Sequence, residues 1–225
     1  MELERLPSPD RITDAVYDHV RAAIVSGQLA AGSRLSVPVL ANALGVSRSP
    51  VREAIVRLTH ERLAREEPRR GAVVAEVGLR ELAALYEVRE VLEGLSARLA
   101  TIRSDPELLE EMLALLRQHE TAVKRDELSK HVEYDTKFHS LMRRSAQNSD
   151  LTRFLDNIQA QVKLAMLTTT VTAGPQRALA DHLLIYRRIL DKDPDGAEQA
   201  ARDHVRRLRE SLLCQADATE ESSAR

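Results

Sequence analysis

The chain has 225 residues, of which 43% are hydrophobic but only 3% aromatic, and it contains no tryptophan. Such an apolar content, made mainly of Ala, Leu and Val, suits packed helices better than β-sandwiches. A formal net charge of −2 and a pI near 6.4 exclude a strong overall basic field for nucleic acid. The single cysteine, Cys214, excludes an intramolecular disulfide. Without a signal-peptide pattern or a membrane-length apolar run, we expect a cytoplasmic protein with no membrane partner.

The first part of the chain predicts three helices followed by a β-hairpin. Apolar residues at helical spacing run over 11–26, and Gly27 ends that helix. Ser36 is a plausible N-cap of a short second helix, and a third helix begins within 47–58. Two short strand candidates, 63–67 and 72–75, flank a turn of Pro, two Arg and Gly. This order predicts a winged helix-turn-helix, which we assign to residues 8–76.

The segment LGVSRSPVREA, residues 44–54, carries the sharpest local pattern. Ser47 or Ser49 can cap the third helix, and with Ser49 as the cap, Pro50 takes the first helical position. Four apolar residues at positions i, i+3, i+4 and i+7 would face the core: Val51, Ala54, Ile55 and Leu58. Arg48, Ser49 and Arg52 are then left on the outer face of the helix.

That outer face is suited to reading DNA. The N-terminal turn of a recognition helix enters the major groove, where Arg contacts guanine edges or phosphates. Residues 34–76 carry eight Arg against five Glu, and Arg69, Arg70 and Gly71 form the hairpin tip. The alternative is an ordinary surface helix with solvated arginines, but it leaves the basic hairpin beside the helix unexplained.

From Leu79 onward every strong segment is helical. Pro106, Pro175 and Pro194 lie at or near helix starts, where a missing N–H costs least. We expect six helices, over 79–102, 106–125, 127–145, 150–169, 176–191 and 195–215. The predicted fold class is therefore mainly α, with an all-helical antiparallel bundle over 79–215 after the winged domain. The small, polar residues 216–225 are expected to form a disordered tail.

Four residues of the second domain predict a metal site. Asp135 and His139 are four residues apart on one helix face, in the apolar stripe of that helix. His182 and His204 lie on the apolar stripes of two further helices. Buried histidines are costly unless paired or ligated, and one Asp with three His suits a divalent transition ion. Zinc is the first choice, with Ni, Mn or Co as alternatives; the competing interpretation is that each His is a satisfied core residue.

The remaining polar candidates have two interpretations each. Arg89 can bind a carboxylate through its guanidinium, or pair with Glu93 at i, i+4. Asn148 can line an effector pocket, or cap the following helix. The other four histidines show no convergence and are expected on the surface: His19, His60, His119 and His131.

The N-terminal stretches resemble the GntR family of bacterial regulators. The resemblance rests on IVSG at 24–27, GSRLS at 32–36, residues 44–54 and RGAVV at 70–74. It implies DNA contacts from Ser47, Arg48, Ser49 and Arg52, and from Gly71 at the wing. Together with Arg34 and Arg70, these are the residues that we predict to bind DNA. Pro38 stands where the family usually has a basic residue, so one customary operator contact is absent.

The metal-ligand pattern extends this resemblance. Asp135, His139, His182 and His204, following such a winged helix, look like the FCD ligand-binding domain of the FadR subfamily, in its smaller VanR-like branch. The resemblance implies a homodimer on a palindromic operator of double-stranded DNA, and a metal that helps to hold a small carboxylate metabolite in a central cavity. Arg89 and Asn148 are candidates to complete that effector pocket. We therefore expect a metabolite-responsive regulator, commonly a repressor, and not an enzyme.

Three rival hypotheses remain at this point. A metalloenzyme with an accessory domain would use the ion to activate water, but no separate general base is evident. A direct metal sensor would respond to the ion itself. A purely structural metal would stabilise the domain without affecting its response.

Overall fold

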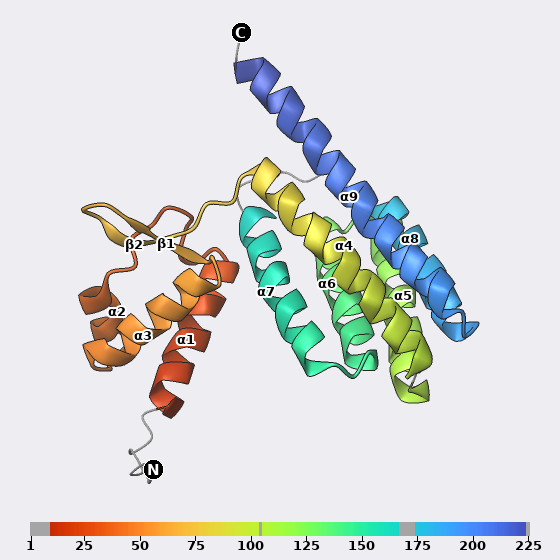
Figure 1. Cartoon of the computed structure of the whole chain (residues 1–225), viewed down its shortest axis with the longest axis horizontal. Coiled ribbons are helices and arrows are strands. Elements are labelled where there is room, and N and C mark those ends of the chain that lie inside the picture. The colour runs from red at the N-terminus through yellow and green to blue at the C-terminus, as the bar shows by residue number, and fades with distance from the viewer. Residues whose placement is uncertain (1–9, 104, 167–173, 224–225) are drawn as a thin grey trace, which may run out of the picture. The chain divides into compact units, whose positions relative to one another are not determined.

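The computed structural model describes residues 10–103, 105–166 and 174–223 (Figure 1). The described residues form two compact units, 10–78 with 159–166, and 79–158 with 174–223. The sequence predicted one uninterrupted helical domain over 79–215. In the structure, residues 159–166 group with the first unit instead. Some predicted positions lie outside the described residues: 8–9 of the winged domain, 167–169 of one expected helix, and 224–225 of the tail.

The N-terminal residues of the first unit have the winged-helix order. Three helices, α1 (Asp10–Val25), α2 (Val37–Leu44) and α3 (Arg48–His60), precede strands β1 (Ala64–Glu67) and β2 (Gly71–Val74). The strands pair antiparallel, with Ala64 opposite Val74 and Glu67 opposite Gly71. An isolated bridge joins Arg34 to Val73, so the segment before α2 lies along the hairpin.

Helix α3 packs as the sequence predicts and begins within the expected segment. Val51, Ala54, Ile55 and Leu58 are all buried in the core. Gly45 ends α2 in the left-handed conformation at φ 65°, which a residue with a Cβ adopts only with strain. Ser47, not Ser49, occupies the N-cap position, so Pro50 is the third helical residue rather than the first. The helix N-terminus therefore presents Arg48 and Ser49 in its first turn.

The second unit contains the predicted helices. They are α4 (Leu79–Ile102), α5 (Pro106–Lys124), α6 (Leu128–Ser145), α7 (Ser149–Met166), α8 (Pro175–Leu190) and α9 (Pro194–Ser223), with the end of α7 grouping with the first unit. Figure 1 shows α4 running beside α9. The mainly α fold with an all-helical second domain is confirmed.

The expected disordered tail is instead the last part of α9. Residues 216–223 contain neither Gly nor Pro, so nothing in the sequence breaks the helix. Arg80 of α4 also holds this end, because its Nη2 lies 2.9 Å from Asp217 Oδ1 and its Nε 2.7 Å from Glu220 Oε1. The prediction of disorder was wrong for the described part of the tail.

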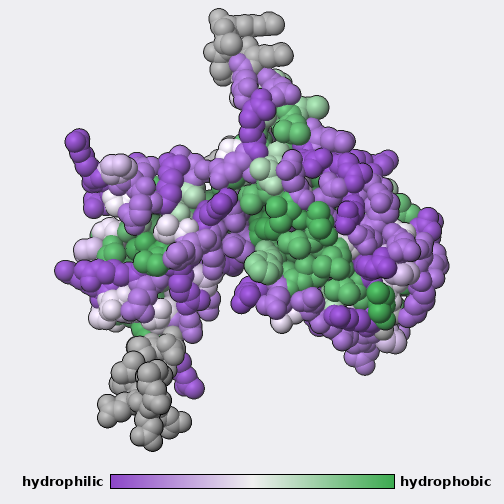
Figure 2. All heavy atoms as spheres, viewed as in Figure 1, coloured by the Kyte–Doolittle hydropathy of each residue, from purple (hydrophilic) through white to green (hydrophobic). Residues whose placement is uncertain are grey.

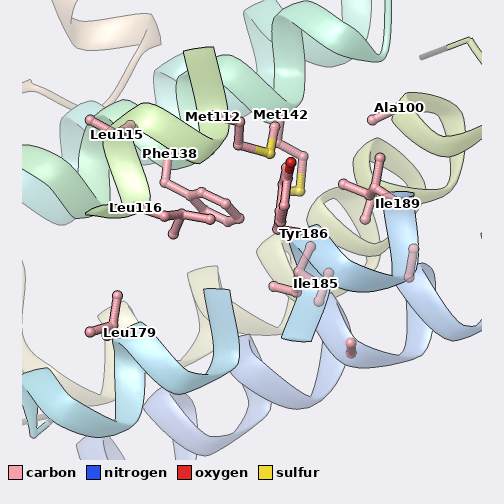
Figure 3. Packing of buried hydrophobic residues seen from close by; sticks show 14 of the residues in the cluster. Ala100, Met112, Leu115, Leu116, Phe138, Met142, Leu179, Ile185, Tyr186 and Ile189 are labelled. Atoms are coloured by element: carbon pink, nitrogen blue, oxygen red, sulfur yellow. The ribbon is translucent and has the colours of Figure 1, made fainter. Parts of the chain in front are cut away.

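A hydrophobic core joins α5, α6 and α8. In Figure 3, Met112 of α5 and Phe138 and Met142 of α6 lie beside Ile185 and Tyr186 of α8. These side chains recur at helical spacing on each helix, so each helix turns one face inward. His139 and His182 follow the same inward faces and are buried with them. None of the described helices is long and apolar enough to cross a bilayer.

Candidate functional site

Four of the predicted DNA-binding residues line one groove in the first unit. Arg34, Arg52, Arg70 and Gly71 border a surface groove of about 430 Å³ between α3 and the hairpin. We call these four residues the arginine groove. Its members come from three separate parts of the chain, and the bridge between Arg34 and Val73 brings the first of them beside the hairpin.

The arginines of this surface differ in how they are neutralised. Among the described residues, the guanidinium groups of Arg34, Arg48 and Arg52 make no hydrogen bond or ion pair, whereas Arg57 is held by Asp14 at 2.6 Å. Unpaired guanidinium groups on an exposed surface are available to phosphate oxygens and base edges. Arg48 and Arg52 are exposed one turn apart on α3, with Ser47 and Ser49 exposed beside them.

The hairpin arginines reverse the roles that the sequence suggested. Arg70 is tied down, because its Nη1 lies 2.6 Å from Glu67 Oε2 and its Nη2 donates to the Gly32 carbonyl at 3.1 Å. Arg69, at the exposed turn with φ 66°, has no hydrogen bond or ion pair among the described residues. Arg69 is therefore the hairpin arginine available to an anion, although it is absent from the predicted set.

The four predicted metal ligands converge in the second unit. Asp135 and His139 of α6, His182 of α8 and His204 of α9 place their ligand atoms within 4.8 Å of one another. We call these four residues the metal centre. The three histidines are buried and Asp135 is half-buried. His182 Nε2 lies 3.5 Å from Asp135 Oδ1, while the His182 and His204 rings are 4.8 Å apart.

The nitrogens of the metal centre lack partners. His139 Nε2, His204 Nε2 and both ring nitrogens of His182 are buried without a hydrogen bond among the described residues. An unsatisfied buried polar group costs about 1–3 kcal/mol, so several together are a heavy cost for a packed core. Three imidazoles and one carboxylate are also a donor set that divalent transition ions prefer. The residues fit a metal ion, and these four side chains could hold one.

Two further carboxylates orient the ligands, and the sequence analysis did not assign them to the site. Asp181 Oδ2 accepts a hydrogen bond from His204 Nδ1 at 3.3 Å, and Glu93 Oε1 lies 3.3 Å from His139 Nδ1. A carboxylate at Nδ1 favours the tautomer whose Nε2 carries the lone pair, and that nitrogen could then bind a metal ion. Asp181 adjoins His182 in sequence, which could have indicated it; Glu93 was considered only as a partner of Arg89.

Burial keeps the ligands in the form that binds metal. Desolvation lowers the pKa of His182 well below its ordinary value, and the neighbouring histidines lower it further. Desolvation also lowers the pKa of His204, although the bond to Asp181 opposes this. Burial alone would raise the pKa of Glu93, but His139, Arg89 and Arg143 bring it below the usual value. The lowered pKa values of His182 and His204 favour neutral imidazoles, the form that binds a metal ion, and the lowered pKa of Glu93 favours its carboxylate.

Arg89 takes one of its two predicted roles and keeps one donor without a partner among the described residues. Its side chain is buried, with Nε 3.5 Å from Glu93 Oε1 and Nη1 donating to the Tyr86 hydroxyl at 3.2 Å. Its Nη2 is buried with no partner among the described residues. The predicted ion pair with Glu93 exists, and one donor of a buried guanidinium is left over for an anionic group.

Asn148 takes the second of its two predicted roles. Its Oδ1 accepts a hydrogen bond from the Leu151 backbone N–H at 3.1 Å, which caps the start of α7. None of the contacts of Asn148 with the described residues places it at the metal centre.

Two histidines expected on the surface are buried instead. His119 of α5 is 1% exposed and His131 of α6 is 8% exposed, whereas His19 and His60 are exposed as predicted. The rings of His119 and His131 are hydrogen-bonded to each other, with His119 Nε2 2.7 Å from His131 Nδ1. Burial and the neighbouring His131 lower the pKa of His119 to about 4. Two features of the sequence could have predicted this burial: His119 lies on the apolar stripe of α5, and His131 precedes Asp135 by four residues.

Comparisons with known proteins agree with this architecture. Residues 12–74 match the model "Bacterial regulatory proteins, gntR family", and residues 84–207 match the FCD domain. The HTH-type transcriptional repressor RspR of Escherichia coli K12 is 26% identical over 202 residues, covering 89% of each chain. The gluconate operon transcriptional repressor of Bacillus subtilis 168 is 30% identical over 181 residues, covering 77% of this chain and 74% of that protein.

Solved structures share the fold. Escherichia coli McbR/YncC has a TM-score of 0.73 at 23% identity, covering 93% of this chain and 99% of that one. A GntR transcriptional regulator from Rhodococcus sp. RHA1 has a TM-score of 0.70 at 23% identity, covering 89% and 97%. At this level of identity the structural matches show the fold alone.

The assignment of Glu93 leads to a prediction about metal affinity. Glu93→Gln removes the charge beside His139 Nδ1, so we expect zinc to bind about 10- to 100-fold more weakly. Competition with a chromogenic chelator measures this affinity, and circular dichroism verifies the fold. Glu133→Gln is the matched control, because Glu133 is exposed on α6 and pairs only with Lys137. Equal zinc affinity in Glu93→Gln and wild type would show that Glu93 does not support the ligand.

Proposed function

This chain belongs to the gntR family of bacterial regulatory proteins and carries an FCD domain, and from that premise we propose that a small carboxylate bound at the metal centre controls the affinity of the protein for its operator. As a member of this family it is a DNA-binding transcription regulator and not an enzyme. The observation that carries the proposal is the convergence of four ligand atoms within 4.8 Å of one another, in an interior where Arg89 Nη2 also lacks a partner.

The arginine groove and the first turn of α3 would contact the DNA. Arg48 and Arg52 would enter the major groove and contact base edges or phosphates, while Arg34 and the hairpin follow the backbone. The missing ion pairs of Arg34, Arg48 and Arg52 support these roles, because phosphates would supply the absent partners. Because a bacterial regulator of this kind acts on chromosomal DNA, we propose that it is located in the cytoplasm. Repressor relatives favour repression as its default action.

An exposed apolar stripe on α4 supports a homodimer. Val88, Val91, Leu95 and Ile102 recur at helical spacing and are all exposed in the single chain; we call them the α4 stripe. Figure 2 shows hydrophobic residues forming one continuous area of the second unit where Figure 1 draws α4. Contiguous apolar surface of this kind marks an interface, and a twofold dimer would read a palindromic operator.

The effector would link the metal centre to this interface through α4. A bound divalent ion supplies positive charge and a coordination position for a carboxylate oxygen. Arg89 would donate from Nη2 to the second oxygen while Glu93 holds its Nε side. Both residues belong to the helix that carries the α4 stripe. Effector binding can therefore bias the dimer between two arrangements with different spacing of the α3 helices. The name of the gluconate operon repressor favours the carboxylate class.

Removing one recognition-helix arginine should weaken specific DNA binding. We expect Arg48→Ala and Arg52→Ala each to lower affinity for the region upstream of the protein's own gene about 10- to 100-fold. Fluorescence anisotropy at fixed salt measures the affinity, and the melting temperature should stay at the wild-type value. Arg117→Ala, an exposed arginine of α5, is the control. Wild-type affinity in both α3 variants would refute the assigned recognition helix.

Effector response should require the metal. We expect gluconate, used as the probe, to release DNA from zinc-loaded wild type but not from chelated protein or from a variant with both Asp135→Ala and His139→Ala. That variant should also lose its zinc by elemental analysis, because it lacks two of the four ligands. Release by zinc alone would identify a direct metal sensor. A lower melting temperature on chelation, with release unchanged, would identify a structural metal.

A charge on the α4 stripe should separate the dimer. Val91→Asp places a carboxylate in the centre of the apolar surface, where burial of an unpaired charge is costly. Sedimentation velocity should show a dimer for wild type and a monomer for the variant, with weakened operator binding. Val132→Asp, on the exposed side of α6, is the control and should remain dimeric. A dimeric Val91→Asp would place the interface elsewhere.

A further inference from the structure

The buried pair of His119 and His131 belongs to none of the roles assigned above. We call these two residues the histidine pair. His119 lies next to the metal centre, because its ring centroid is 5.7 Å from that of His182. It approaches from α5, whereas Arg89 and Glu93 approach from α4. The histidine pair therefore places a polar group, the His119 ring, beside His182 from α5, in addition to the polar groups of Arg89 and Glu93 on α4.

The histidine pair satisfies only part of its own hydrogen-bonding capacity. The single bond between His119 Nε2 and His131 Nδ1, at 2.7 Å, uses one nitrogen of each ring. His131 also lines a small surface pocket of about 140 Å³ with Ala122, Asp126 and Pro175. The inner nitrogen, His119 Nδ1, is buried with no partner among the described residues.

A purely structural role explains this arrangement poorly. A leucine or phenylalanine at position 119 would continue the apolar stripe of α5 without leaving a polar atom unsatisfied. Nor does the histidine pair join the ligand set, because His119 and His131 are not among the residues whose ligand atoms come together in the metal centre. The unpartnered Nδ1 is thus best explained by a hydrogen-bonding group that arrives with a ligand.

We propose that His119, backed by His131, is a second polar contact for the effector, and that the effector is a carboxylate that also carries a hydroxyl group. The imidazoles share one proton along their hydrogen bond, so Nδ1 of His119 can donate or accept according to which ring holds that proton. A hydroxyl group can likewise donate or accept, which makes it the matching partner. The carboxylate would lie toward Arg89 and the metal, and the hydroxyl toward α5. This inference rests on the proposed function and adds the chemistry of the ligand.

The test compares carboxylates that differ only in hydroxyl groups. Calorimetry on zinc-loaded protein measures binding of lactate against propionate, and of gluconate against hexanoate. We expect wild type to bind the hydroxylated member of each pair about tenfold more tightly, as one satisfied buried hydrogen bond allows. His119→Phe should lose this preference and keep the wild-type zinc content. His119→Gln, which retains a donor and an acceptor, should recover part of it.

The controls separate this inference from the proposed function. His60→Phe replaces an exposed histidine and should keep the preference. Wild type without any preference, or an equal preference in His119→Phe, overturns the role of His119 while leaving carboxylate binding intact. Loss of zinc in a folded His119→Phe protein also overturns it, because His119 would then be a ligand. Wild type that binds zinc but no carboxylate contradicts the effector proposal as well, and so does wild type that binds no zinc.

Discussion

The second unit depends on a cluster of imidazoles that are buried in a helical core and have several ring nitrogens without a partner among the described residues. Hydrophobic packing around Phe138, Met142 and Ile185 removes water from these rings, and water would otherwise have satisfied them. Each unsatisfied nitrogen opposes folding, so the sequence tolerates them only where a ligand supplies the missing interactions. Binding of a metal ion or other ligand at the metal centre would therefore also stabilise the folded helical bundle. It would act directly on the packing of α6, α8 and α9.

Helix α4 connects the parts of the second unit. One face carries Arg89 and Glu93, which reach the interior beside His139, while another carries the exposed α4 stripe. The same helix packs along α9, which supplies His204. A shift of α4 that improves the contacts of Arg89 with an anion must therefore alter both the surface offered to a second copy and the support of a metal ligand. Coupling through this one helix is the physical basis that we propose for a two-state response.

In the first unit, the described groups that lack partners and bear on the proposed function are arginines on the surface rather than histidines in the core. Its structural arginines are neutralised inside the domain, as Arg57 is by Asp14 and Arg65 by Glu67 and Glu76. The arginines that we propose to contact DNA have no acidic partner among the described residues: Arg34, Arg48 and Arg52. A domain with little net charge can still bind a polyanion when its unpaired cations share one face, because the local field rather than the total charge acts on the phosphates.

Patterns in the sequence alone were enough to predict the winged helix-turn-helix, the helical second domain and the four candidate metal ligands, because periodic apolar residues fix which face of each helix turns inward. His139, His182 and His204 followed those faces, so their convergence could be predicted without coordinates. Only the tertiary structure decided the partners: Glu93 and Asp181 behind the ligands, the hydrogen bond between His119 and His131, and the different states of Arg69 and Arg70. These contacts join separate helices, or set one turn conformation, and depend on how the elements are rotated and spaced. Local patterns specify an element and its inward face, but the distance between two side chains on different elements is fixed only when the whole core is packed.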